Sequence, residues 1–145
     1  MATAAEPYFA SLTIPARVES LRAAAAFLVQ AAKSLKVAAA SEPTFELAIV
    51  EALTNAFKHG GSRGRAKDAT ILCELELAGQ SLVVRILDSG PGFQLPPFSM
   101  PGVSKENVAA LPEAGYGLPV IQSVFPGVRT VTRDDWFGLE LPLEL

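Results

Sequence analysis

Residues 69–88 have the sequence ATILCELELAGQSLVVRILD, and this stretch decides the fold. Apolar side chains alternate with polar ones from Ala69 to Leu77 and recur from Ser81 to Asp88, the period of a strand with one buried face. The residues between them, Ala78-Gly79-Gln80, are typical of a tight turn. The stretch therefore predicts a β-hairpin, which requires an antiparallel pair of strands.

Working outward, the same criteria predict an order of β-α-α-β-β-loop-α-β-β. The further elements are a strand from Tyr8 to Ile14, a helix from Val18 to Leu35, a helix from about Pro43 to Gly60, a short helix from Leu118 to Phe125, and strands at Val128–Arg133 and Trp136–Leu143. Hairpins exclude an all-parallel sheet. We expect an α+β two-layer sandwich, with a mixed, mostly antiparallel sheet and its helices on one face.

Composition narrows the class of protein. The 145 residues carry 12 Lys and Arg against 15 Asp and Glu, a net charge of −3, which does not favour a nucleic-acid binder. Cys73 is the single cysteine, so no disulfide forms within the chain. The longest apolar run, Ala23 to Val29, is far too short to span a bilayer, and the first residues do not resemble a signal peptide. We expect one cytoplasmic domain over residues 1–145, without membrane or nucleic-acid partners.

The second predicted helix carries a polar stripe. Glu51, Asn55, Lys58 and His59 are spaced so that they lie along one side of this helix. A solvated helix face is the ordinary interpretation of such a stripe. A functional site is the alternative, because the stripe holds a neutral Asn among apolar neighbours near the end of the helix.

Two glycine-containing segments are also candidates. Asp88 ends a strand and shares a face with three apolar residues, and Gly90 and Gly92 follow it, where a flat ligand can approach the backbone. The alternative for this segment is an Asx turn that closes the strand. The second segment, Gly115-Tyr116-Gly117-Leu118, precedes a short helix, as in many phosphate sites, although glycine near a helix start is common.

Taken in this order, the three segments resemble the nucleotide-binding boxes of the GHKL ATPase superfamily, and particularly its branch of anti-sigma factor serine kinases. Residues 51–60, EALTNAFKHG, resemble the N box of that family. Residues 88–93, DSGPGF, resemble its first glycine box, and residues 115–118, GYGL, its second. The likeness covers about Tyr8 to Leu141. Gly138 is followed by Leu139, where many relatives have a threonine.

The resemblance implies a histidine-kinase-like ATP-binding fold with Mg²⁺ and a lid at about residues 94–114. It implies that Asn55 holds Mg²⁺ and that Glu51 is the general base for a serine or threonine hydroxyl. It implies that Asp88 accepts a hydrogen bond from the exocyclic amine of adenine. The remaining nucleotide-binding candidates are the residues of the glycine boxes and three basic side chains: Gly90, Gly92, Gly115, Tyr116, Gly117, Leu118, Lys58, His59 and Lys105.

The function implied by this resemblance is that of an ATP-dependent serine/threonine protein kinase. It would act as an anti-sigma factor that binds a sigma factor and phosphorylates an anti-sigma factor antagonist. A homodimer is expected through the face of the first strand, which carries Tyr8, Phe9, Leu12 and Ile14. The alternatives are an ATP-sensing binding module without catalysis, a kinase acting on a signalling scaffold or phosphatase, and a structural domain with incidental glycine turns.

Overall fold

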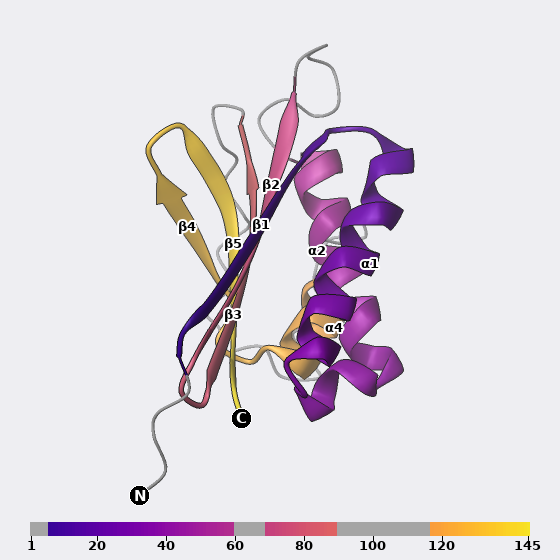
Figure 1. Ribbon diagram of the computed structural model, residues 1–145. Helices are drawn as coiled ribbons and strands as arrows, with labels where there is room; N and C mark the ends of the chain where they lie inside the picture. The colour runs from indigo at the N-terminus through magenta and orange to yellow at the C-terminus, as the bar shows by residue number, and fades with distance from the viewer. Residues whose placement is uncertain (1–5, 60–68, 90–116) are drawn as a thin grey trace, which may run out of the picture.

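The computed structural model describes residues 6–59, 69–89 and 117–145. In this part of the chain, five strands form one antiparallel sheet in the order β1-β2-β3-β5-β4, and the helices lie on one of its faces (Figure 1). The predicted α+β sandwich is confirmed. The element order is also the predicted one, except for one short 3-10 helix.

The hairpin predicted from residues 69–88 forms the middle of the sheet. Strand β2 (Thr70–Ala78) pairs with β3 (Ser81–Asp88), from Ala78 opposite Ser81 to Ile71 opposite Asp88. The turn between them contains Gly79 at φ +61°, a left-handed conformation that glycine adopts without the strain that a Cβ would add. Turn chemistry and alternation therefore place Asp88 at one end of a central strand.

Strands from the two ends of the chain flank this hairpin. Strand β1 (Tyr8–Pro15) pairs with β2 at one edge of the sheet. Strand β5 (Trp136–Glu144) pairs with β3 and forms a second hairpin with β4 (Arg129–Arg133), the other edge. The turn of this hairpin contains Asp134 at φ 55°, a conformation that Asp tolerates better than most residues.

The helical layer packs over the inner face of the sheet. It consists of α1 (Val18–Ser34), the 3-10 helix η1 (Ala38–Ser41), α2 (Pro43–His59) and the short α4 (Leu118–Val124). Helix α2 packs against α1, α4 and β3, and is therefore the helix that connects the other parts of the layer with the middle of the sheet. The rings of Phe45 in α2 and Phe125 after α4 pack with centroids 5.5 Å apart.

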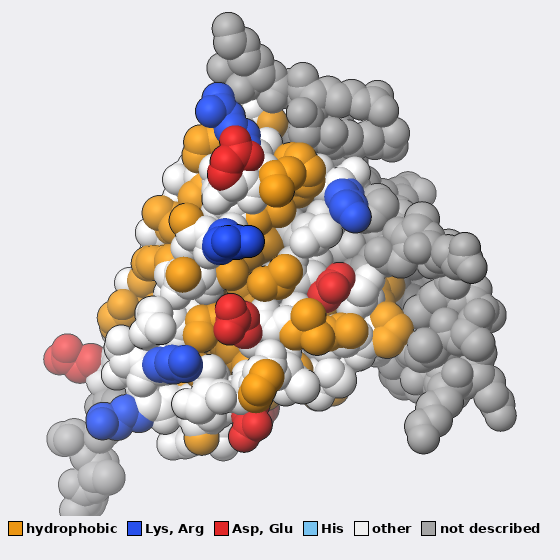
Figure 2. Space-filling model, turned by 90° about the vertical axis from the view of Figure 1, so that its right-hand side faces the viewer, with side chains coloured by type: hydrophobic (Ala, Val, Ile, Leu, Met, Phe, Trp, Pro, Cys, Tyr) orange, Lys and Arg blue, Asp and Glu red, His pale blue; other side chains and the backbone are white. Residues whose placement is uncertain are grey.

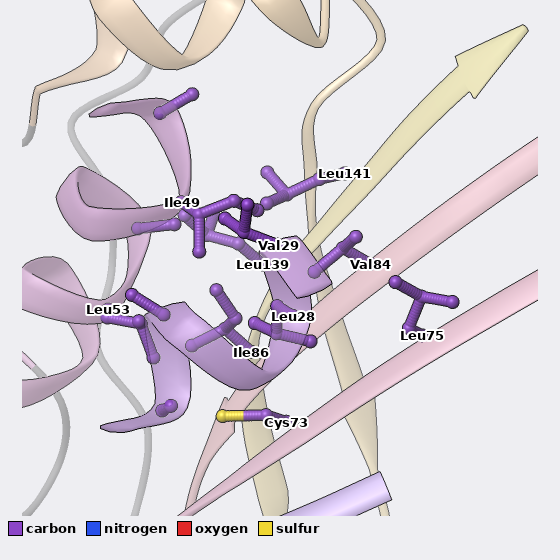
Figure 3. Close-up of a cluster of buried hydrophobic side chains, with 14 of the residues drawn as sticks. Leu28, Val29, Ile49, Leu53, Cys73, Leu75, Val84, Ile86, Leu139 and Leu141 are labelled. Atoms are coloured by element: carbon purple, nitrogen blue, oxygen red, sulfur yellow. The ribbon is translucent and has the colours of Figure 1, made fainter. Parts of the chain in front are cut away.

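The hydrophobic core lies between these two layers. Figure 3 shows side chains from α1, α2 and the central strands converging there, among them Leu28, Ile49, Val84 and Leu141, all fully buried. Cys73 of β2 belongs to the same cluster. Burial raises the pKa of its thiol to about 12, so the thiol stays protonated and unreactive at neutral pH.

The residues of β1 divide between the two faces of the sheet. Tyr8 and Phe9 are 40% and 55% exposed, whereas Ile14 is buried in the core and Leu12 packs against it. The strand period places Tyr8, Leu12 and Ile14 on the side toward the helices and Phe9 on the outer side. Of the four residues expected at a dimer contact, Ile14 is therefore buried within its own chain.

The outer face of the sheet, which no described helix covers, carries an ionic network. Arg85 of β3 donates from Nε to Glu140 Oε2 of β5 (2.8 Å), and Arg129 of β4 donates from Nε to Glu140 Oε1 (2.7 Å). On β2, Glu74 Oε2 accepts a hydrogen bond from Arg133 Nη2 of β4 (2.7 Å). We call this set, completed by Glu76, the outer-face network.

The outward side of the helical layer is chemically mixed. Figure 2 shows separate acidic and basic side chains scattered among apolar ones on this side. The exposed large apolar residues of the helices are Val18, Leu47 and Val50. Among the described residues, none of the helices has the length and apolarity that crossing a bilayer requires.

Candidate functional site

The polar stripe predicted on the second helix lies on α2, and its described residues differ in exposure. Asn55 is 3% exposed, Glu51 is half-buried and Lys58 is exposed. A buried neutral amide between two charged residues does not fit a plain solvated helix face, because burying a polar group is costly unless it has a partner. His59 ends the helix, and its side chain lies outside the described residues.

Asp88 ends β3 on the inner face of the sheet. It is fully buried, and it shares this face with Leu82, Val84 and Ile86, as the alternation predicts. The next residue, Ser89, is held to Thr70 of β2 by two hydrogen bonds, from Thr70 N to Ser89 Oγ (3.2 Å) and from Ser89 N to Thr70 O (3.3 Å). These bonds fix the strand end that presents the Asp88 carboxyl group.

Two flanking residues of Asp88 are not predicted by the sequence. Ile71 of β2 and Phe137 of β5 are its cross-strand partners, and direct partners point to the same face. Alternation shows which face a residue occupies, but the partner on the next strand depends on the register. The register between β3 and β5 joins residues 88 and 137, which are far apart in the chain.

A close approach of two backbones fixes this register. A Cβ on Gly138 would overlap the carbonyl oxygen of Ile86 and lie 2.8 Å from the Cα of Leu87. The next residue, Leu139, is buried opposite Ile86. An apolar side chain therefore stands in the core at the position where the sequence resemblance leads us to expect a threonine.

The start of α4 lies directly against α2. Gly117 precedes α4 at φ 63° and ψ 17°, in the left-handed region. A Cβ built on Gly117 would overlap Glu51 Oε2 and lie 3.0 Å from both Cβ and Cδ of Glu51. The structure thus brings together the ends of two predicted segments, the polar helix stripe and the second glycine segment, which are separated by 65 residues in the chain.

All three predicted segments therefore lie around one helix. Glu51 and Asn55 belong to α2, Gly117 contacts α2, and Asp88 ends a strand on which α2 packs. Figure 1 shows that the His59 end of α2 lies toward the end of the sheet where β2 begins, which is also where Asp88 pairs with Ile71. Among the described residues, Glu51, Asn55 and Gly117 therefore meet at α2, and Asp88 ends a strand that packs on the same helix.

Other candidates either lie outside the described residues or have a packing role. Leu118 is described, and its buried side chain anchors the first turn of α4. The predicted lid at residues 94–114 lies outside the described residues. So do five of the predicted site residues: Gly90, Gly92, Lys105, Gly115 and Tyr116.

An antiparallel five-stranded sheet with all its described helices on one face is the α+β arrangement of histidine-kinase-like ATPase domains. Residues 14–136 match the family model of the histidine kinase-like ATPase domain, and the chain belongs to this family. Domains of this GHKL superfamily bind ATP, typically with Mg²⁺. No curated protein matches the chain.

The residues present fit these ligands. Across the described residues, no group of three or more His, Cys, Asp and Glu side chains is placed to hold a metal ion. Mg²⁺ in nucleotide sites takes few protein ligands beside phosphate oxygens and water, and a single amide oxygen such as that of Asn55 suits this requirement. A carboxylate held at a strand end, as in Asp88, suits an amine donor such as that of adenine.

Proposed function

We propose that this chain is an ATP-dependent serine/threonine protein kinase of the anti-sigma factor type. The observation that carries the proposal is the Glu51 carboxylate, which lies against Gly117 at the head of α4 and one helical turn before the buried Asn55. A carboxylate in this place provides a base beside the segment that resembles a phosphate-binding box. A hydroxyl nucleophile needs such a base, because its proton must leave as the oxygen attacks.

Each residue then has a distinct task. Asp88 would accept a hydrogen bond from the exocyclic amine of adenine, and the side-chain oxygen of Asn55 would hold Mg²⁺, which would neutralise phosphate charge. Glu51 accepts the proton of a serine or threonine hydroxyl on the target protein. As the hydroxyl oxygen bonds to the γ-phosphorus, the bond from that phosphorus to the β,γ-bridging oxygen breaks and ADP leaves.

The partners are proposed from the sequence resemblance. They are a sigma factor, which the chain binds, and an anti-sigma factor antagonist, which it phosphorylates. For the proposed homodimer, Tyr8 and Phe9 are the exposed apolar residues of β1, at the free edge of the sheet. We propose that the protein acts in the cytoplasm.

The test is phosphate transfer from γ-labelled ATP with Mg²⁺ to the antagonist protein encoded nearest to it in its genome. We expect the wild-type protein to label the antagonist. Glu51→Gln keeps the size of the side chain and removes the base, so it should lower the transfer rate by about 100- to 10,000-fold. ATP affinity, measured by calorimetric titration, should stay unchanged in this variant.

The matched control is Glu46→Gln, the same substitution at an exposed position of the same helix, and it should leave the rate unchanged. Asp88→Asn should instead weaken ATP binding, because the amide no longer offers the same acceptor pair to adenine. ATP binding without any labelling of the antagonist would contradict the kinase and support a non-catalytic ATP-sensing module.

A further inference from the structure

The contact between Gly117 and Glu51 raises the question of why position 117 is a glycine. One reason is the backbone, because φ 63° lies in the left-handed region, which disfavours residues with a Cβ. A second reason is the neighbour. The Glu51 side chain occupies the space that a Cβ at position 117 would fill, with Glu51 Cβ and Cδ both 3.0 Å from that point.

A comparison with Gly79 distinguishes the effect of the backbone from the effect of the neighbour. It has nearly the same backbone conformation, φ +61°, but a Cβ built there has no neighbour within 4 Å. Both glycines therefore satisfy a left-handed turn. Only Gly117 also leaves room for a carboxylate.

The backbone at Gly117 is not free to move away from α2. Helix α4 starts at the next residue, and its Leu118 and Ile121 are buried. Ile121 N donates a hydrogen bond to Gly117 O (3.0 Å), and Phe125 beyond the helix packs on Phe45 of α2. A Cβ at position 117 would therefore displace the Glu51 carboxyl group, which is the end of a flexible side chain, more readily than it would displace α4.

We infer that Gly117 is a positioning residue for Glu51: its missing Cβ holds open the place in which the carboxylate acts as the base. This inference rests on the proposed kinase function. It adds a role for Gly117 beyond the backbone contacts to phosphate that the sequence resemblance implies. A small displacement of a reacting group is sufficient to lower a rate by about 100-fold.

The experiment compares Gly117→Ala with Gly79→Ala in phosphate transfer, ATP affinity and urea unfolding. Both variants place an alanine in a left-handed conformation and should lower the urea midpoint, and Gly117→Ala should lower it further because its Cβ also meets Glu51. Gly117→Ala should lower kcat by about 100-fold and keep its ATP affinity. Gly79→Ala should keep the wild-type kcat.

A second pair of variants tests whether the effect passes through Glu51. Glu51→Asp withdraws the carboxyl group from position 117 and lowers the rate by itself. Adding Gly117→Ala to it should then cost little further activity, since the overlap with the end of the Glu51 side chain is gone. Independent effects that multiply in the double variant would overturn the inference.

Two further outcomes distinguish a failure of the positioning role from a failure of the proposed kinase function. If the wild type transfers phosphate and Gly117→Ala loses ATP affinity with an unchanged kcat, the positioning role is wrong and the proposed kinase function stands. If the wild type binds ATP and transfers no phosphate, the proposed function is wrong, and the role of Gly117 as a support for a catalytic base falls with it.

Discussion

The two faces of the sheet hold the fold together by different interactions. The inner face is covered by helices, and its buried side chains are apolar up to Asp88 at the end of β3. The outer face carries the outer-face network, in which Arg85 and Glu140 are mostly buried although no described helix covers them. The inner face depends on removing apolar surface from water, and the outer face on satisfying charges that strand pairing has brought together.

This difference shows where a polar residue on the sheet indicates function. On the outer face, buried charges have opposite charges as partners on other strands of the sheet, so their role is structural. On the inner face, Asp88 interrupts an apolar layer at the strand end beside α2. A carboxylate at this position places a hydrogen-bond acceptor at the strand end beside α2, which suits a binding site.

The largest effect is expected on the inner face. Leu28→Ala removes a fully buried side chain of α1 and should lower the free energy of unfolding by about 2–5 kcal/mol. The same substitution at Leu47, which is 47% exposed on α2, should change it by less than about 0.5 kcal/mol. Urea unfolding measures both values, and equal losses would show that the inner face does not dominate stability.

An intermediate effect is expected from Arg85→Ala on the outer face. This change leaves the largely buried Glu140 and Glu74 without one of their cationic neighbours and should cost about 1–3 kcal/mol. Arg129→Ala is the control, because the Arg129 side chain is 70% exposed and an exposed pair contributes about 0–1 kcal/mol. High salt should reduce the loss at Arg129 and leave the loss at Leu28 unchanged. A loss at Arg129 as large as that at Arg85 would contradict this ranking.

The smallest effect on the free energy of unfolding is expected when the pH is lowered and Glu140 becomes protonated. Burial alone would raise the pKa of Glu140, but hydrogen bonds from Arg85 and Arg129 outweigh it and hold this pKa below its ordinary value of 4.5. The unfolded chain then binds the proton more readily than the folded protein does, so this stabilisation is complete above pH 4.5 and is lost as the pH falls through the lower, folded pKa.

Glu140→Gln tests this linkage, because glutamine does not titrate. The difference in free energy of unfolding between wild type and this variant, followed by urea unfolding from pH 7 downward, should be constant near neutrality and shrink in acid. A difference that grew in acid would reverse the sign of the linkage.

Much of the fold was predictable because its signals are local. Alternation and turn residues give both hairpins, and the inner position of Asp88 follows from the same period. The sequence does not predict the 3-10 helix at Ala38–Ser41, since a run of alanines carries no hydrophobic period. The predicted helix from Val18 to Leu35 is confirmed to within one residue, as α1 (Val18–Ser34).

The strand order, the strand register and the contact between helices depend on residues that are far apart in the chain. The order β1-β2-β3-β5-β4 and the register that places Phe137 beside Asp88 join residues far apart in the chain. The contact of Glu51 with Gly117 requires both the packing of α4 on α2 and a left-handed residue 117. The family resemblance indicated that these segments share a site, and no local pattern could give the contact itself.

The burial of Cys73 has a practical consequence. The chain holds no other cysteine, and a protonated thiol inside the core does not react with maleimide dyes at neutral pH. A thiol introduced at the surface, for example by Gln80→Cys in the exposed hairpin turn, would be the single point of attachment for a fluorophore. Fluorescent labelling at one chosen position is therefore possible while the native core stays intact.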